Sequence, residues 1–132
     1  MTELKILLCA SAENPWLKQG TEETERLEYC FEGFKYIYRD AAEVTAEDAK
    51  MADIVIGRIP AELLPTAENL KWLHVATADV RGYDKAELYV NDFAIVTRGD
   101  AFAAPAAAME KVLVLMEQYL GGGDLDNEIE LA

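Results

Sequence analysis

The segment from residue 52 to residue 82 constrains the fold more than any other part of this chain. It contains two short, largely apolar runs, 53–57 and 72–76, separated by a proline-containing stretch that is typical of a short helix. Both runs are too continuously apolar for a sheet with one face in water, so they are predicted to be parallel strands covered on both faces. Ligands of such sheets bind just beyond the carboxyl ends of the strands. A binding site is therefore expected near residues 58–60 and 77–82.

The remainder of the chain alternates in the same way between strand-like and helix-like patterns. Further strands are predicted at residues 4–10, 34–38 and 93–97. The most polar of these, 34–38, is expected at an edge of the sheet. Helices are predicted at residues 21–32, 45–51 and 106–120, with Thr21 and Thr45 as N-caps. Five strands that alternate with helices require a parallel sheet with right-handed crossovers, and the expected fold is a single three-layer, flavodoxin-like α/β domain (residues 1–132) with strand order 2-1-3-4-5.

The composition excludes several classes of function. The 132 residues include 12 Lys and Arg against 25 Asp and Glu, a net charge of -13, and such a chain repels nucleic-acid backbones. No apolar run approaches the roughly 18 residues of a membrane span, and the first residues lack a signal-peptide pattern, so we expect a soluble, cytoplasmic protein. Cys9 and Cys30 are expected to be reduced. The chain contains a single histidine and no cluster of Cys and His, so no metal site is expected.

Two other protein classes that share this architecture do not fit the loops. A receiver domain needs acidic residues after its first and third strands, where this chain has Ala10-Ser11 and Gly57-Arg58. A flavin phosphate needs a glycine-rich loop after the first strand, and here residues 10–15 contain no glycine but include Glu13. Neither a receiver function nor a bound flavin is expected.

Several polar side chains remain as candidates at the carboxyl ends of the strands. Three arginines each follow a predicted strand: Arg58, Arg81 and Arg98. They would recognise a carboxylate if they surround one crevice, or they are solvated side chains that balance Asp79 and Asp100. His74 lies inside a predicted strand, which favours a packed or hydrogen-bonded histidine over a general base.

The middle of the sequence also carries a series of motifs in a recognisable order. A strand ends in Gly57, and it is followed by ELLPTAENLKW, the loop ATADVRGYD, the strand NDFAIVT and the helix start FAAP. Over residues 5–105 this series resembles the substrate-binding domain of the NAD-dependent D-2-hydroxyacid dehydrogenases. In that family FAAP leads through a linking helix into a Rossmann domain, after which the chain returns to the first domain.

The C-terminal part of this chain looks like that returning segment. Residues 112–132, VLVLMEQYLGGGDLDNEIELA, resemble its ending, yet they begin only a few residues after Pro105. The resemblance implies that the Rossmann domain has been removed, naturally or by engineering, with a seam near residues 106–108. Residues 1–105 and 106–132 would then form the two parts of one substrate-binding domain.

The resemblance also implies which site residues are left. The family's dinucleotide fingerprint and its catalytic Arg, Glu and His belong to the absent domain, so no catalytic or cofactor-binding residue is assigned here and no NAD or NADP is expected. The substrate-carboxylate loop matches Ala78 and Asp79, and Arg58 and Ile59 would face the same cleft. Asp79 replaces the family's Gly, and Arg81 replaces its Asp. A carboxylate at Asp79 repels a bound carboxylate unless Arg81 neutralises it, so small 2-oxo or 2-hydroxy acids are expected to bind weakly.

Three functional hypotheses follow. The chain is an isolated substrate-binding domain without catalytic activity, a half-enzyme that acts with a separate Rossmann domain, or a ligand-free scaffold. The second hypothesis requires an exposed apolar strip along residues 102–109. A monomer is expected, with a dimer through the surface left by the missing domain as the alternative.

Overall fold

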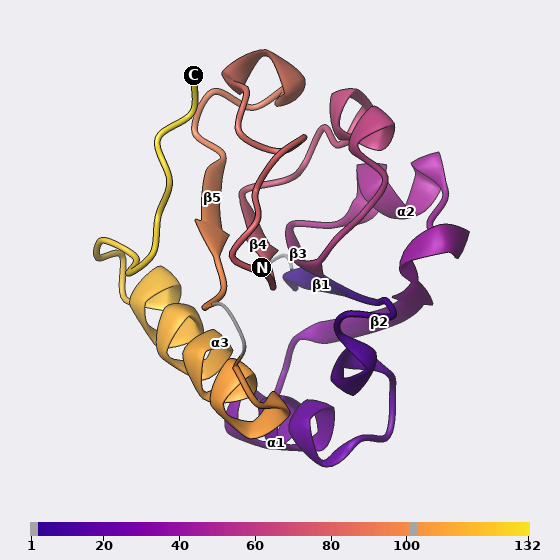
Figure 1. Ribbon diagram of the computed structural model, residues 1–132, viewed down its shortest axis with the longest axis vertical. Helices are drawn as coiled ribbons and strands as arrows, with labels where there is room; N and C mark the ends of the chain where they lie inside the picture. The colour runs from indigo at the N-terminus through magenta and orange to yellow at the C-terminus, as the bar shows by residue number, and fades with distance from the viewer. Residues whose placement is uncertain (1–2, 101–102) are drawn as a thin grey trace.

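A computed structural model, which describes residues 3–100 and 103–132, contains one five-stranded parallel sheet (Figure 1). Its strands are β1 (Lys5–Ala10), β2 (Lys35–Asp40), β3 (Ile54–Gly57), β4 (Trp72–Val75) and β5 (Ile95–Arg98). The order across the sheet is β2-β1-β3-β4-β5, and every neighbouring pair is parallel. The predicted α/β fold and strand order are therefore confirmed, including the edge position of β2.

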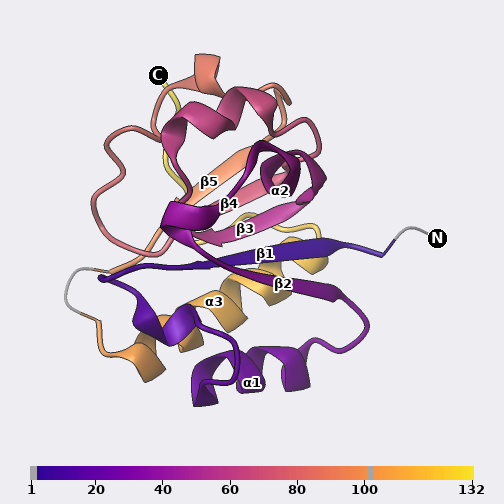
Figure 2. The same cartoon turned by 90° about the vertical axis from the view of Figure 1, so that its right-hand side faces the viewer.

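The two faces of the sheet are covered by different sets of helices. On one face lie α1 (Glu22–Cys30) and α3 (Pro105–Leu120), which pack against each other (Figure 2). The other face is covered by α2 (Ala46–Met51) and the 3-10 helix η3 (Ala61–Thr66). Three shorter 3-10 turns connect the elements: η1 (Pro15–Leu17), η2 (Ala41–Glu43) and η4 (Ala86–Leu88).

The hydrophobic core is divided by the sheet into two layers, because successive side chains of a strand point to opposite faces. Ile56 and Trp72 pack with α1 and α3, whereas Val55 and Leu73 pack with α2 and η3. All four side chains are fully buried. The continuous apolar runs thus belong to strands that are covered on both faces, as the sequence predicts.

Both predicted N-caps are present. The Thr21 hydroxyl accepts a hydrogen bond from the backbone N–H of Thr24 at 3.2 Å and starts α1. At the start of α2, Thr45 and Asp48 form a reciprocal capping box. Helix α1 ends two residues earlier than predicted, and Gly33 then turns the chain with φ = 94°.

The segment after α3 runs back along the outer edge of β5 (Figure 1). Thr97 and Glu128 form an antiparallel bridge, and the backbone N–H of Ile129 donates to the carbonyl of Val96 at 2.9 Å. Leu125 is buried beneath the same sheet face as α3. Residues from both ends of the chain therefore complete one sheet and one core.

Candidate functional site

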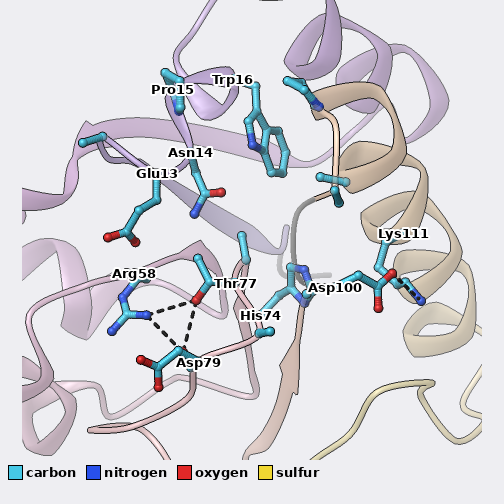
Figure 3. Close-up of a pocket in the computed structure, with 17 residues that line it drawn as sticks. Glu13, Asn14, Pro15, Trp16, Arg58, His74, Thr77, Asp79, Asp100 and Lys111 are labelled. Carbon is cyan, nitrogen blue, oxygen red and sulfur yellow. Dashed lines mark hydrogen bonds and ion pairs between the residues drawn. The ribbon is translucent and has the colours of Figure 1, made fainter.

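A cleft of about 820 Å³ opens at the carboxyl ends of the strands (Figure 3). Its walls come from the segments that follow β1, β3, β4 and β5 and from the first two turns of α3. Arg58 and residues 77–79 line it, so the cleft coincides with the region in which the parallel sheet predicts a site.

Two glycines allow the strand ends to approach each other closely around this cleft. A Cβ on Gly57, which has φ = 115°, would lie 2.3 Å from the carbonyl oxygen of Cys9 in β1. A Cβ on Gly99 would lie 2.9 Å from the carbonyl carbon of Ala76. The N–H of Gly99 donates to the carbonyl of Val75 at 2.8 Å and thereby joins the end of β5 to the end of β4. Any side chain at these positions would push the walls of the cleft apart.

One wall of the cleft is the loop that follows β4. The Arg58 guanidinium reaches into it from the end of β3 and donates hydrogen bonds to the hydroxyl of Thr77 and the carbonyl of Asp79, each at 3.0 Å. The same guanidinium carbon lies 5.1 Å from the ring centroid of Tyr83, within the range of a cation–π contact. Arg58 is thus held in place by three partners.

The charged groups at the tip of this loop neutralise each other. Both Nε and Nη2 of Arg81 donate to the Asp79 carboxylate, with a shortest distance of 2.7 Å, and the Arg81 backbone N–H donates to it as well. These hydrogen bonds hold the pKa of Asp79 well below its usual range. The neutralisation of Asp79 by Arg81, which the sequence leaves open, is therefore present. Arg81 itself is strongly exposed, with 89% of its side chain in solvent.

The backbone amides of this loop are available to a ligand. Within the described part of the chain, neither the N–H of Ala78 nor that of Asp79 donates a hydrogen bond. Both residues line the cleft. A bound oxygen atom would satisfy these donors.

Three of the residues that the sequence places at the cleft lie elsewhere. Ile59 is 1% exposed and belongs to the core layer on the α2 side, because the residue after Arg58 turns to the opposite face of the sheet. The expectation that Ile59 faces the cleft is corrected accordingly. Arg81 points into solvent, and the backbone of Arg98 pairs with Asn127 of the C-terminal segment. Of the three arginines, Arg58 lines the cleft.

The opposite wall contains a buried chain of hydrogen bonds. The indole N–H of Trp72 donates to the hydroxyl oxygen of Thr97, and that oxygen also lies 2.8 Å from Nδ1 of His74. His74 is 1% exposed. The indole can only donate, so the Thr97 hydroxyl hydrogen is free to be donated to Nδ1, and we assign the imidazole proton to Nε2 on that basis. The interpretation of His74 as a packed, hydrogen-bonded histidine is confirmed.

The surroundings of His74 keep its ring neutral. Burial and the nearby positive charge of Lys111 lower its pKa to about 4, and Asp100 opposes this shift only in part. At neutral pH the imidazole therefore carries one proton and no charge. It presents a hydrogen-bond donor that does not depend on pH in the physiological range.

Sequence reasoning missed two polar lining residues, Asn14 and Lys111. The Asn14 amide, oriented by its hydrogen-bond network with its nitrogen toward the carbonyls of Glu13 and Ala76, donates to them at 3.1 and 3.2 Å. Lys111 stands on the polar side of the α3 pattern, yet only 26% of its side chain is exposed and it lies 3.5 Å from the Asp100 carboxylate. The local signal for Asn14 is its position directly before a proline. No local feature of the sequence indicates that Lys111 lines the cleft.

Other kinds of site are not formed by the described residues. Within residues 3–100 and 103–132, no three side chains of His, Cys, Asp or Glu gather closely enough to hold a metal ion. In the same part of the chain no helix has the length and apolar character that crossing a membrane requires.

Comparison with known proteins yields structural likeness only. No protein-family model and no curated protein matches the sequence. The structure is similar to a D-isomer specific 2-hydroxyacid dehydrogenase family protein from Aeromonas salmonicida subsp. salmonicida A449, with a TM-score of 0.55 and 17% identity over 92% of this chain and 34% of that one. A phosphoglycerate dehydrogenase from Lactobacillus plantarum has a TM-score of 0.48 and 22% identity, over 89% of this chain and 36% of that one.

The likeness concerns the fold of one part of a longer protein. At 17% identity it shows a shared fold. The chain spans about a third of the length of the proteins it matches. The fold of this chain is thus similar to that of one part of the Aeromonas protein.

Proposed function

We propose that this chain is the substrate-binding part of a D-2-hydroxyacid dehydrogenase without its Rossmann domain, and that it binds small 2-oxo or 2-hydroxy acids weakly without turning them over. The observation that carries the proposal is the cleft at the carboxyl ends of the strands. It combines an arginine held by its neighbours, Arg58, with the N–H groups of Ala78 and Asp79. Backbone donors and guanidinium groups are the usual partners of a carboxylate.

The order of the motifs supports the proposal that a Rossmann domain is missing between Pro105 and the segment 112–132. The segment 112–132, which resembles the family's returning C-terminal part, packs directly on the sheet formed by residues 5–98. About a third of the Aeromonas protein is matched by nearly all of this chain. On this proposal the nicotinamide cofactor and the catalytic side chains would reside in the part that this chain lacks, and hydride transfer needs that cofactor.

A turnover assay tests the proposal. The purified chain is mixed with NADH and, in turn, pyruvate, glyoxylate and hydroxypyruvate, and absorbance at the NADH band is followed over time. We expect no oxidation above a protein-free control. An intact D-2-hydroxyacid dehydrogenase serves as the positive control, and turnover by this chain alone would contradict the proposal.

A half-enzyme that acts with a separate Rossmann domain is the second candidate. Residues 103–107 at the start of α3 are exposed and rich in alanine, and Ala103 and Pro105 border the cleft. Phe102, at the beginning of the predicted docking strip, lies outside the described residues, and Met109 at its end is buried. Co-elution with a Rossmann domain of the same family in gel filtration, together with restored NADH oxidation, would favour this candidate.

A further inference from the structure

The wall formed by β4, β5 and α3 carries two groups for which the proposed function gives no role, His74 and Lys111. Figure 3 shows both side chains at the side of the cleft away from Arg58. Nδ1 of His74 is occupied by Thr97, whereas its Nε2 has no hydrogen-bond partner among the described residues. Among the described residues no fully buried side-chain nitrogen or oxygen lacks a partner, so Nε2 is accessible from the cleft, where a ligand or water can accept a hydrogen bond from it.

We propose that His74 and Lys111 form a subsite for an oxyanion, and that it takes the carboxylate of a small 2-oxo acid. This inference rests on the proposed function for the class of ligand. The proposed position of the ligand differs from the one that the family resemblance implies. The carboxylate would lie against β4, β5 and α3, whereas the resemblance implies the loop after β4.

The donors of this subsite are oriented before a ligand arrives. The hydrogen bonds from Trp72 through Thr97 to His74 hold the ring in place at the cleft, and the assigned tautomer carries its proton on Nε2. Preorganised donors in a buried setting bind an oxyanion more strongly than donors that must first leave water. The ammonium of Lys111 supplies a full positive charge to the same cleft, which both residues line.

The existing partner of Lys111 leaves room for a ligand. Its nitrogen lies 3.5 Å from the Asp100 carboxylate, longer than the usual 2.7–2.9 Å of a charged hydrogen bond. Asp100 is largely exposed, with 60% of its side chain in solvent, so the pair is weak. An arriving carboxylate therefore competes with an exposed acceptor that water readily solvates.

The loop after β4 is the other place in this cleft for a carboxylate, and its side-chain donor is already engaged. Arg58 already donates to Thr77 and to the Asp79 carbonyl, and these bonds would have to rearrange for it to bind a ligand. The Asp79 side chain adds a negative charge at the same rim, and Arg81 neutralises it from the solvent side. The wall with His74 carries one acid, Asp100, which is loosely paired with Lys111; the cleft is also lined by Glu13.

The test uses NMR on the intact chain, because the chain contains one histidine and its ring signals are unambiguous. Oxamate, a stable 2-oxo acid analogue, is titrated while the ring nitrogens of His74 and the backbone amides are followed. We expect the free protein to show the Nε2–H tautomer, and oxamate to shift the Nε2–H signal. Lys111→Met should weaken oxamate binding at least tenfold, and the control Lys85→Met, at an exposed position outside the cleft, less than twofold.

The outcomes separate the two proposals. Shifts confined to the amides of Ala78 and Asp79, with Lys111→Met as tight as the unmodified chain, would overturn this inference and leave the proposed function standing. An Nδ1–H tautomer would also overturn it. No shift with any 2-oxo acid would overturn both proposals. Inorganic phosphate is titrated in parallel, and stronger binding of phosphate than of oxamate at His74 would overturn the assignment to a carboxylate.

Discussion

The two walls of the cleft differ in the burial and the charge state of their polar side chains. On the loop after β4, Asp79 and Arg81 are ionised, exposed and bound to each other. On the wall of β4, β5 and α3, His74 is buried and neutral and is held by Thr97, which in turn is bonded to Trp72. The loop carries an exposed ion pair, whereas the other wall combines the buried, neutral His74 with the more loosely paired Lys111 and Asp100.

This difference indicates which wall can bind a ligand in a defined orientation. Exposed ion pairs contribute little, since water and salt compete with both partners. A buried network that is fully hydrogen-bonded fixes the direction of each donor, and its disruption leaves unpaired groups in the interior. The expected effects of substitution are therefore large at the buried wall and small at the exposed loop.

The largest effect is expected from protonation of His74. Its pKa of about 4 in the folded chain lies below the ordinary value of 6.5. Between these two pH values the unfolded chain binds a proton that the folded chain does not, so the free energy of unfolding falls as the pH is lowered through this window. The full loss is on the order of 3 kcal/mol, at about 1.4 kcal/mol for each pKa unit.

This prediction is checked by urea unfolding of the unmodified chain and of the variant His74→Gln at a series of pH values. Glutamine does not titrate, so the difference in unfolding free energy between the two chains should change across pH 6.5 to 4 and stay constant above it. The charged groups that face the ring, Lys111 and Asp100, are present in both chains. Parallel curves for the two chains would show that His74 is not a buried neutral ring.

A smaller loss is expected when the centre of the buried network is removed. Thr97→Val keeps the shape of the side chain but leaves the Trp72 N–H and His74 Nδ1 without their shared partner. We expect a loss of about 2 kcal/mol in unfolding free energy. Thr97→Ser keeps the hydroxyl and should lose less than about 1 kcal/mol. Equal losses for the two variants would assign the effect to packing instead of hydrogen bonding.

The smallest effect is expected at the exposed loop. Asp79→Asn removes the charge that Arg81 pairs with, and the urea midpoint should not change measurably because both partners are in water. Oxamate affinity should change less than about twofold if the carboxylate binds at His74. A gain of about fivefold or more would instead place the carboxylate within about 4 Å of Asp79, at the loop.

The sequence predicts the sheet well because its strongest signals are local. The apolar runs of β1, β3 and β4 and the alternation with helices are enough to define a parallel sheet and its order. The N-caps at Thr21 and Thr45 follow from residue type and spacing alone. These features depend on neighbours within a few residues.

The site is harder to predict because it depends on contacts between distant residues. The hydrogen bond between His74 and Thr97 requires the register of β4 and β5, in which these residues are paired, and β5 begins at Ile95 instead of the predicted residue 93. Lys111 reaches the cleft only because α3 crosses the sheet near its carboxyl end. The burial of Ile59 is hard to predict for a similar reason. A shift of one residue along the chain decides on which face of the sheet a side chain lies.

The bridge between Thr97 and Glu128 also affects whether two copies of this protein can associate through the edge of the sheet. An uncovered edge strand offers a row of backbone donors and acceptors to which another chain can add as a further strand. At β5, Arg98 and Val96 are already bonded to Asn127 and Ile129, so that row is partly occupied. The opposite edge, β2, carries charged residues at both ends, Lys35 at its start and Asp40 at its finish, and such charges discourage strand addition. The C-terminal segment thus protects one margin of the sheet from aggregation, while charge protects the other.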